Sequence, residues 1–314
     1  MGKQREKYQQ LIRLCQRLAP VPTAVAHPCD AVSLSGAVEA AKLGLIVPIL
    51  VGPAARIAAA AQEAKIDIST FELIDTPHSH ASADHAVCLV REGKAQMLMK
   101  GSLHTDELMA AVINAQTGLR TDRRISHAFI MDVPSLDHPI IVTDGAINIF
   151  PTLKDKMHIL QNAIDLAHSL GIKEPKAAIL SAMETVNPEV PSTVEAAALC
   201  KMAERGQITG ALLDGPLALD NAIDLQAAQI KKIHSAVAGK ADILLVPDLE
   251  AGNMLAKSLT FMADADAAGI VLGARVPIVL TSRADSLTSR LASCAVAVLV
   301  VAANNKKVLQ GHTA

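Results

Sequence analysis

Five short polar segments each follow a predicted strand, and their residue types suit the binding of an oxyanion. The segment 280–286 (LTSRADS) places Ser282 and Arg283 at the start of a predicted helix. An Arg with neighbouring hydroxyl groups at a helix start is a good holder for a phosphate. Turn chemistry explains any one such segment, but five of them in one chain favour a site. The other four are MKGSLHT (99–105), TDGAINIFP (143–151), LDGPLALDN (213–221) and VPDLEAGNMLAK (246–257).

These four segments supply further candidate residues. Gly101 permits a close approach of the backbone, and Ser102 and Thr105 can cap the next helix, whose N-terminus favours an anion. An ordinary capped helix is an equally good interpretation of this segment. Asp144 and Asn148 are short polar groups between apolar stretches, as a site or a tight turn would need. The remaining candidates of this kind are Asp214, directly after a predicted strand, and Asn253, at the opening of a predicted helix.

Signatures of several other sites are absent from the sequence. It has no GxGxxG, no GxxxxGK[ST] and no GxSxG motif. The three histidines at 78, 80 and 85 are close in sequence, but a solvated loop and helix start explains them better than a metal site. The five cysteines are odd in number and form no CxxC pair. They predict core residues in a reducing compartment, neither a disulfide framework nor a thiolate metal site.

Composition excludes several classes of protein. Of 314 residues, 51% are hydrophobic and 19% charged, which is typical of a globular chain, and the net charge of −2 draws it to neither nucleic acid nor an anionic membrane. Only 2% are aromatic, so base-stacking platforms are lacking. The N-terminus predicts an amphipathic helix without an apolar signal region. The longest apolar stretches, 43–55 and 294–303, are shorter than the ~18 residues of a membrane helix. We therefore expect a soluble, cytoplasmic protein.

Short apolar runs alternate with amphipathic segments, which predicts parallel sheets covered on both faces by helices. An antiparallel hairpin, 126–131 with 139–143, interrupts this rhythm in the middle of the chain. We expect two packed α/β domains of similar size with a ligand cleft, because no flexible linker divides them. The strands expected are 23–27, 48–52, 71–75, 95–99, 176–181, 208–213, 243–246, 270–272, 277–280 and 296–302.

Taken together in this order and spacing, the five segments resemble the phosphate acetyl/butyryltransferase family over about residues 21–303. The pair PDLEAGNML and SRADS is the most specific part, and the SRADS ending is closer to short, butyryl-type members. The resemblance implies an isocitrate/isopropylmalate dehydrogenase-like α/β fold, with mostly parallel sheets and the active site in a cleft between two domains. The expected domains are residues 1–145 plus 290–314, and 146–289.

The resemblance also implies a reaction: acyl-CoA plus phosphate gives acyl phosphate plus CoA, by direct transfer without a metal or another cofactor, on acetyl to butyryl groups. It further implies a homodimer. Ser282 would donate to the oxyanion and Arg283 would hold the phosphate. Further phosphate contacts would come from Ser102, His104 and Thr105. Asn253 and Lys257 would shape the cleft wall or meet CoA, and Arg120, Arg123 and Arg124 either bind CoA phosphates or form a solvated basic turn.

One departure concerns the general base. Acetyl-type members carry a catalytic Asp seven positions after the motif Ser, where this chain has Ser289. Asp285 is the nearest carboxylate that could replace it, and a helix cap is its other interpretation. Two other functions stay open. A non-catalytic acyl-CoA-sensing module would have the same fold, and an NAD-dependent dehydrogenase would need clustered metal-binding Asp residues, of which the sequence shows no convincing pattern.

Overall fold

The computed structural model describes residues 4–281 and 285–311, with side chains from 9 to 281 and from 285 to 306. The chain forms two compact units: residues 1–123 with 268–314, and residues 124–267. The sequence analysis placed these boundaries at 145 and 289 instead. The hairpin falls in the second unit because its strand 140–143 pairs with strand 243–245 there.

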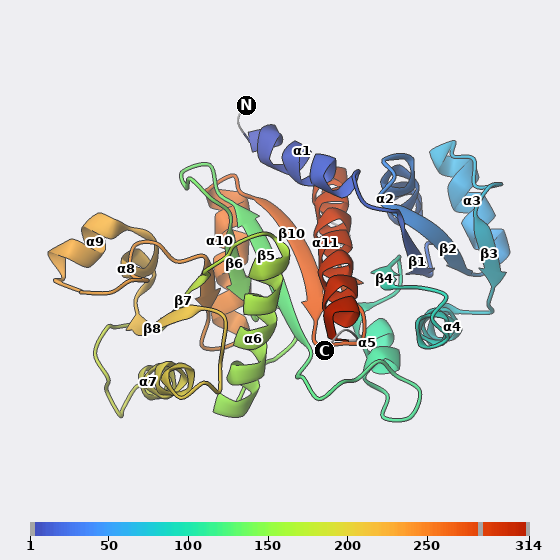
Figure 1. Ribbon diagram of the computed structural model, residues 1–314. Coiled ribbons are helices and arrows are strands. Elements are labelled where there is room, and N and C mark those ends of the chain that lie inside the picture. Colours follow the sequence, from blue (N-terminus) through green and yellow to red (C-terminus); the bar gives the residue numbers. More distant parts are fainter. Residues whose placement is uncertain (1–3, 282–284, 312–314) are drawn as a thin grey trace. The chain divides into compact units, whose positions relative to one another are not determined.

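Unit 1 contains a six-stranded arrangement in the order β3-β2-β1-β4-β11-β10 (Figure 1). Strands β1, β2, β3, β4 and β11 run parallel, whereas β10 is antiparallel to β11. Four of these strands agree with the expected runs 23–27, 48–52, 71–75 and 95–99 to within two residues. The strands are β1 (Val21–Ala26), β2 (Ile46–Gly52), β3 (Glu72–Asp75), β4 (Met97–Lys100), β10 (Asp266–Leu272, residues 268–272 in this unit) and β11 (Ile278–Val279).

The helices of unit 1 fall into two groups by their contacts. Helix α2 packs on α3 and α11, and α11 also contacts α1, while α4 packs on α5. Both groups contact the strands, as expected for a sheet covered on both faces. The helices are α1 (Gln4–Cys15), α2 (Ala31–Lys42), α3 (Ala54–Ala64), α4 (Ser79–Arg91), α5 (Thr105–Ile113) and α11 (Leu287–Gly311).

Helix α11 corrects one prediction: the run 296–302, expected as a strand, lies inside this helix. Its residues Cys294, Ala295, Val296 and Ala297 are all fully buried. A short apolar run does not distinguish a strand from a helix that is buried on every side, so the β-branched residues misled the prediction. The segment Leu287–Lys306 is long and apolar enough to cross a membrane by length and composition alone, but 56% of its best apolar window is buried in the structure.

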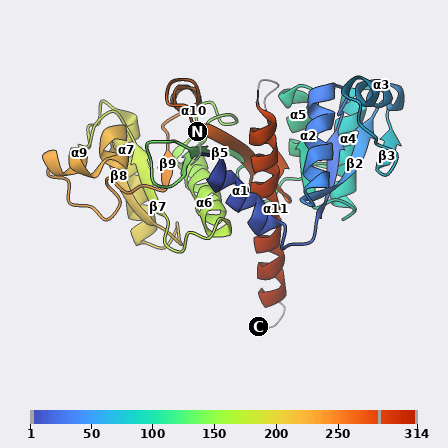
Figure 2. The same ribbon diagram turned by 90° about the horizontal axis from the view of Figure 1, so that it is seen from above.

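Unit 2 contains strands in the order β5-β6-β9-β7-β8. The predicted antiparallel hairpin is confirmed as β5 paired with β6, and the other pairs are parallel. Helices α6 and α10 lie on opposite sides of these strands (Figure 2), with α7 beside α6. The elements are β5 (Ser126–Asp132), β6 (Ile140–Thr143), α6 (Leu153–Ser169), β7 (Lys176–Leu180), α7 (Pro191–Glu204), β8 (Leu212–Leu217), α8 (Leu219–Ile223), α9 (Leu225–Ile230), β9 (Ile243–Leu245) and α10 (Leu249–Met262).

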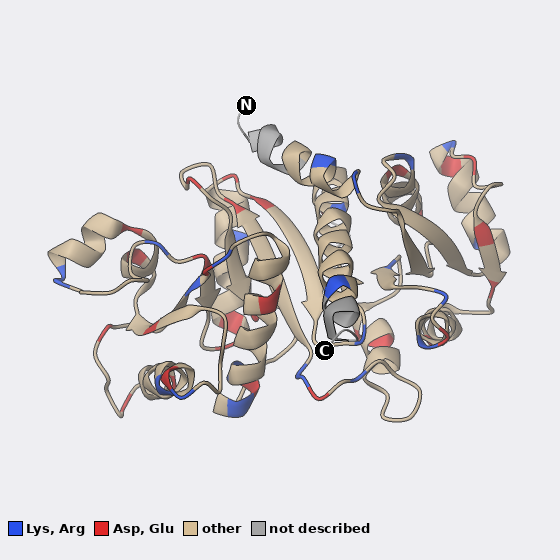
Figure 3. Ribbon diagram, in the orientation of Figure 1, with Lys and Arg blue, Asp and Glu red and all other residues tan. Residues whose placement is uncertain are grey.

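Strand β8 corrects a second prediction. The sequence analysis ended a strand at Leu213 and placed Asp214 beyond it, whereas Asp214, Gly215 and Pro216 lie inside β8. β8 is the edge strand of unit 2. An edge strand tolerates Pro216, which has no backbone N–H, and Gly215, which has no side chain. Basic and acidic positions are interspersed along the described ribbon of both units (Figure 3), in keeping with the small net charge.

Candidate active site

In unit 1, the segment after β4 is bound tightly to the end of β1. The N–H of Gly101 donates to the carbonyl of Ala26 at 2.8 Å, and that of Ser102 donates to the carbonyl of His27 at 2.9 Å. A Cβ on Gly101 would lie 2.4 Å from both carbonyl oxygens, so only glycine fits here. The Ser102 hydroxyl also donates to the His27 carbonyl, at 2.9 Å, and accepts from the N–H of Cys29, at 3.2 Å.

Helix α5 begins differently from the prediction. The residue before its first turn is His104, and Thr105 is already helical. The Ser102 hydroxyl donates to the His27 carbonyl after β1 and does not cap α5. The carboxylate of Glu107 accepts from the His104 N–H at 2.8 Å and from the Ser79 hydroxyl at 2.6 Å. These hydrogen bonds lower the pKa of Glu107 and keep it charged. Gly101, Ser102, His104 and Thr105 thus lie together at the carboxyl ends of β1 and β4.

A cavity of about 400 Å³ opens beside this segment. Its lining includes His27, Asp30, Arg56, Ser102 and His104. The Arg56 guanidinium lies 3.3 Å from Nε2 of His27, and Nδ1 lies 3.0 Å from the Ser82 hydroxyl. Because an Arg only donates, Nε2 accepts and Nδ1 carries the proton. Burial lowers the pKa of His27, and the Arg56 charge lowers it further, so the imidazole is a neutral support for Arg56.

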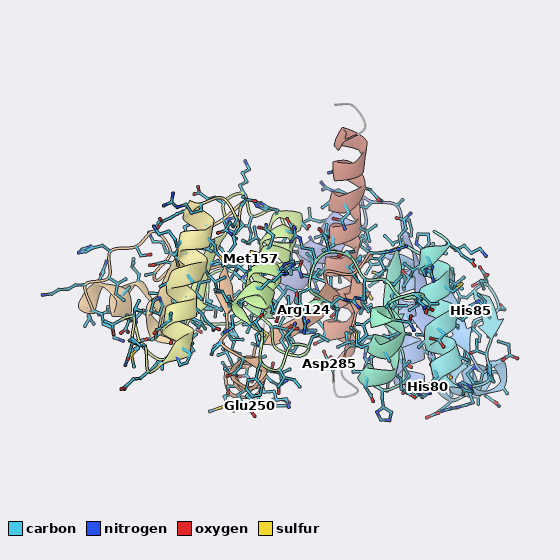
Figure 4. The ribbon with its side chains drawn as sticks, turned by 90° about the horizontal axis from the view of Figure 1, so that it is seen from below. His80, His85, Arg124, Met157, Glu250 and Asp285 are labelled. Atoms are coloured by element: carbon cyan, nitrogen blue, oxygen red, sulfur yellow. The ribbon has the colours of Figure 1, made fainter. Side chains whose placement is uncertain are left out.

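Sequence reasoning did not select His27 or Arg56. His27 ends a strand-like run and Arg56 is a single charge in a helix, so neither belongs to a motif. The histidines selected as a possible metal cluster are on the outside of α4: His80 and His85 are exposed there (Figure 4), and His78 caps the helix by accepting from the N–H of Ala81. Within residues 4–281 and 285–311, no group of three or more His, Cys, Asp or Glu side chains is arranged to hold a metal.

The two residues predicted to carry the reaction, Ser282 and Arg283, lie outside the described residues. Their described neighbours are Thr281, which is buried, and Asp285, which is half-buried and lies two residues before α11 (labelled in Figure 4). The hydroxyl of Ser286 accepts from the N–H of Ser289 at 3.1 Å. The described residues Thr281, Asp285 and Ser286 lie in the chain between β11 and α11, in unit 1.

In unit 2, Asp144 holds together the loop that follows β6. Its Oδ1 accepts from the N–H groups of Ala146 and Ile147 at 2.9 and 3.0 Å, and its Oδ2 accepts from both nitrogens of Asn148 at 3.3 and 2.5 Å. Asp144 is 2% exposed and Asn148 3% exposed. Both carboxylate oxygens of Asp144 accept hydrogen bonds from the residues that follow it, so its role in the structure is to shape the loop.

Asn148 extends this network to a basic residue. Its amide oxygen accepts from Nε of Arg124 at 2.7 Å, and its amide nitrogen donates to the carbonyl of Ile125 at 2.9 Å. Arg124 also lies 3.6 Å from the carboxylate of Asp155. The guanidinium is half-exposed, and Arg124 (labelled in Figure 4) lies two residues before β5. Arg124 is thus held in place by the buried Asn148 and by Asp155.

Beside Asp144 lies His127, a buried histidine that the sequence analysis did not select. Burial lowers its pKa to about 4, although the Asp144 charge acts in the opposite direction. Its ring meets that of Phe129 edge-on, with centroids 4.3 Å apart, and Nδ1 has no hydrogen-bond partner in the part of the chain that the structure describes. A neutral, enclosed imidazole is not reached by a substrate, so we assign it to the support of the Asp144 loop.

The first turn of α10 packs against this loop. A Cβ on Gly252 would lie 2.6 Å from the Asp144 carbonyl, and the Asn253 amide donates to the Gly145 carbonyl at 3.2 Å. Asp144, Asn148 and Asn253 are therefore brought together, and Lys257 is exposed one turn further along α10. Asp214 is not part of this group, because β8 lies three strands from β6, roughly 14 Å at the usual strand spacing.

The comparisons with known proteins agree with this architecture. The family model for phosphate acetyl/butaryl transferase matches residues 79–298. A phosphate acetyltransferase of Rhizobium meliloti is 64% identical over 95% of both chains. A phosphate butyryltransferase of Clostridium acetobutylicum is 43% identical over 90% of this chain and 93% of its own.

Solved structures give the same result. A branched-chain phosphotransacylase from Enterococcus faecalis aligns with a TM-score of 0.78 at 31% identity, over 90% of this chain and 99% of its own. A 4-hydroxythreonine-4-phosphate dehydrogenase from Burkholderia phymatum, at 14% identity and a TM-score of 0.54 over 90% and 98%, shares the fold alone. This supports the predicted dehydrogenase-like α/β fold. The chain therefore belongs to the phosphate acetyl/butyryltransferase family of acyltransferases.

Proposed function

We propose that this chain transfers a short acyl group between CoA and inorganic phosphate. The observation that carries the proposal is the 64% identity, across 95% of the chain, with a protein named phosphate acetyltransferase. The substrates are an acyl-CoA and phosphate in one direction, and an acyl phosphate and CoA in the other. The protein acts in the cytoplasm as a homodimer and needs neither a metal nor a cofactor other than CoA as substrate.

Direct transfer suits the cysteines of the chain. An acyl-enzyme intermediate would need a thiolate nucleophile. Burial raises the pKa of Cys29, beside the cavity of unit 1, to about 11, and the pKa values of Cys15, Cys200 and Cys294 to about 12. A hydrogen bond to Glu92 raises the pKa of Cys88. Each thiol is therefore a poor nucleophile near neutral pH, which favours attack by phosphate itself.

The reaction proceeds through one tetrahedral intermediate. A phosphate oxygen forms a bond with the thioester carbon, and the carbonyl electron pair moves onto oxygen. Ser282 donates to this oxyanion, which a water-poor site makes effective, and Arg283 holds the phosphate with two parallel hydrogen bonds. The oxyanion electron pair then re-forms the carbonyl as the C–S bond breaks, and Asp285 passes the proton that it took from the attacking hydrogen phosphate to the CoA thiolate. In the reverse direction, Asp285 takes the thiol proton.

The other predicted residues bind and position. Gly101, Ser102, His104 and Thr105 present the start of α5 to the phosphate, while Asn253 and the exposed Lys257 contact CoA. Asp144 and Asn148 shape the loop behind Asn253. Asp214 contributes to the edge strand β8, so we expect its replacement to leave turnover unchanged.

The test is the release of CoA from acetyl-, propionyl- and butyryl-CoA by the purified protein, with and without phosphate. We expect release that requires phosphate, yields acyl phosphate and persists in EDTA. Loss of activity on chelation, restored by Mg²⁺, would contradict the metal-free reaction. Inactivity with all three acyl-CoAs, together with binding of one of them, would establish the sensing module instead.

The acyl pocket is expected to tolerate several chain lengths. The SRADS ending is butyryl-type, yet the most similar relative reported above is named an acetyltransferase. Each methylene changes binding by about 1 kcal/mol, so values of kcat/KM for acetyl- and butyryl-CoA should differ by less than about 100-fold. A larger preference for acetyl-CoA would contradict the butyryl-type interpretation.

A further inference from the structure

The carboxylate of Glu107 joins the starts of two helices that are far apart in the chain. Glu107 is the third residue of α5, and its side chain is 15% exposed. One oxygen, Oε2, accepts from the N–H of His104, directly before α5, at 2.8 Å. The other, Oε1, accepts from the hydroxyl of Ser79, the first residue of α4, at 2.6 Å. Both helices belong to unit 1, so the arrangement is complete within one unit.

A helix cap explains only half of this arrangement. A Glu at the third position of a helix accepts from the N–H of the residue before the helix, which is the bond between Oε2 and His104. The bond to Ser79 adds nothing to that cap, because Ser79 lies 28 residues earlier, on another helix. A hydroxyl that donates to a carboxylate makes one of the stronger hydrogen bonds in proteins. This bond is also the main cause that lowers the pKa of Glu107.

The start of α4 has a cap of its own. The ring of His78 accepts from the N–H of Ala81, so α4 does not depend on Glu107 for its first turn. Nδ1 of His80 lies 3.3 Å from Oε1 of Glu107, but the His80 side chain is 69% exposed, and an ion pair this exposed contributes little. The bond between Ser79 and Glu107 therefore sets the spacing between the two helix starts and caps neither of them.

The segment that this bond holds is the one predicted to meet phosphate. Its first part is fixed to the end of β1 through the N–H groups of Gly101 and Ser102. Its last part, the exposed His104 and the half-buried Thr105, is continuous with the first turn of α5. Because the first turn of α5 is tied to α4 through Glu107, a shift of α5 along α4 would move His104 and Thr105 while Gly101 stayed in place.

We infer that Glu107 is a positioning residue for the phosphate substrate and that it acts through Ser79. Together they hold His104 and Thr105 where these residues meet phosphate. The inference rests on the proposed function, which assigns phosphate to this segment. Glu107 does not bind the phosphate itself, because a carboxylate repels an oxyanion and both of its oxygens already accept hydrogen bonds. Its benefit is therefore geometric, and its charge alone would act in the opposite direction.

Initial rates of CoA release over a phosphate series, with the full-length protein, separate geometry from charge. Glu107→Gln keeps the length of the side chain, and its amide can accept from the His104 N–H and donate to the Ser79 hydroxyl, so the bridge is retained without the charge. We expect kcat/KM for phosphate to fall roughly 10-fold in Glu107→Ala and in Ser79→Ala, but less than threefold in Glu107→Gln. The KM for butyryl-CoA should change less than threefold in all three variants.

The double variant Ser79→Ala/Glu107→Ala tests whether the two residues act through their mutual bond. If they do, it loses no more than the larger single loss, whereas independent contributions multiply to roughly 100-fold. Ser79→Ala leaves the bond between Glu107 and His104 intact, so it reports on the bridge even if Glu107→Ala does not fold. Asp84→Ala is the matched control: it removes an exposed carboxylate from α4 and should leave the phosphate dependence unchanged.

Three kinetic results would overturn the inference. An unchanged phosphate dependence in Ser79→Ala would remove the bridge from phosphate binding. A loss in Glu107→Gln as large as that in Glu107→Ala would make the charge of Glu107, and not its position, the contribution. A multiplicative loss in the double variant would mean that Ser79 meets the phosphate without Glu107.

Failure of the proposed function is seen separately, in the wild type. If the wild type releases no CoA from any of the acyl-CoAs with phosphate, the proposed function fails, and the melting temperature in inorganic phosphate decides the inference, because a ligand of the folded state raises it. A rise in the wild type and in Glu107→Gln that is reduced in Ser79→Ala supports the inference. Equal rises in all of these proteins, or no rise in the wild type, would overturn it.

Discussion

The hydroxyl oxygen of Ser286 accepts a hydrogen bond from the backbone N–H of Ser289 at 3.1 Å, and so caps helix α11. The sequence analysis left two interpretations for Asp285: a general base or a helix cap. Because a hydroxyl accepts at Ser286, one residue later, the described N–H of Ser289 does not depend on Asp285. This relationship makes the two interpretations separable by substitution.

Asp285→Asn tests the general base. We expect kcat to fall about 10²- to 10⁴-fold, the usual contribution of a general base, with a smaller loss at high pH where more CoA is already thiolate. The melting temperature should stay nearly unchanged. Ser286→Ala is the matched control: it removes the cap and should cost about 1 kcal/mol of stability. A stable Asp285→Asn protein with wild-type kcat would remove Asp285 from the chemistry.

Ser289→Asp tests the position at which acetyl-type members carry their catalytic carboxylate. Ser289 is half-buried, its hydroxyl lies 3.0 Å from that of Ser286, and an Asp in the first turn of α11 is favoured by the helix dipole. We expect this variant to raise kcat, and to rescue part of the loss in an Asp285→Asn background. If neither Asp285→Asn nor Ser289→Asp changes the rate, CoA ionises without a side-chain base, and binding and positioning carry the reaction.

Arg283→Lys tests the phosphate contact predicted from the SRADS segment. Lysine keeps the charge but loses the two-pronged geometry of the guanidinium. Loss of a charge-assisted hydrogen bond costs on the order of 1.5–3 kcal/mol, so the KM for phosphate should rise roughly 10- to 100-fold and that for CoA much less. Initial rates over a phosphate series measure this, with Arg91→Lys on α4 as the control. An unchanged phosphate dependence would exclude Arg283 from the site.

Much of the fold follows from periodicity. Buried apolar runs bounded by turn residues located β1 to β4 and the β5–β6 hairpin, because their strand and loop signals agree locally. The secondary-structure predictions failed where burial in the folded protein, and not the local sequence pattern, decides the structure. The run 296–302 has β-branched residues, yet it is enclosed in α11, and Asp214 looks like a turn residue, yet it lies in an edge strand. Both depend on which elements pack around them, which a local pattern does not contain.

Part of the candidate site was likewise located from the sequence, and part was not. The segment 99–105 and the loop after β6 were located because short polar residues interrupt apolar runs, and these residues do gather in their units. The sequence analysis missed the residues that hold these in place. They are His27, which contacts Arg56, His127, which lies beside Asp144, and Arg290, which donates to the Thr281 hydroxyl. Each is a single residue within a helix or strand, and acts only through a partner that is distant in sequence. Only the three-dimensional contacts assign such residues.

The buried His127 predicts a pH dependence of stability. Its pKa is lowered to about 4 in the folded protein, so the folded state binds fewer protons than the unfolded state, whose histidine titrates near pH 6.5. This contribution is complete above pH 6.5 and is lost as the pH falls toward 4. Between these values the slope attributable to His127 is up to about 1.4 kcal/mol per pH unit.

Urea unfolding between pH 7.5 and 4.5 measures this slope in three proteins. His127→Gln has no titrating imidazole at the buried position, so its free energy of unfolding should fall less steeply below pH 6.5 than that of the wild type, whatever its stability at pH 7.5. His85→Gln, at an exposed position on α4, should keep the wild-type slope. Equal slopes for the wild type and His127→Gln would mean that His127 accepts a proton without unfolding, with the charge of Asp144 compensating its burial.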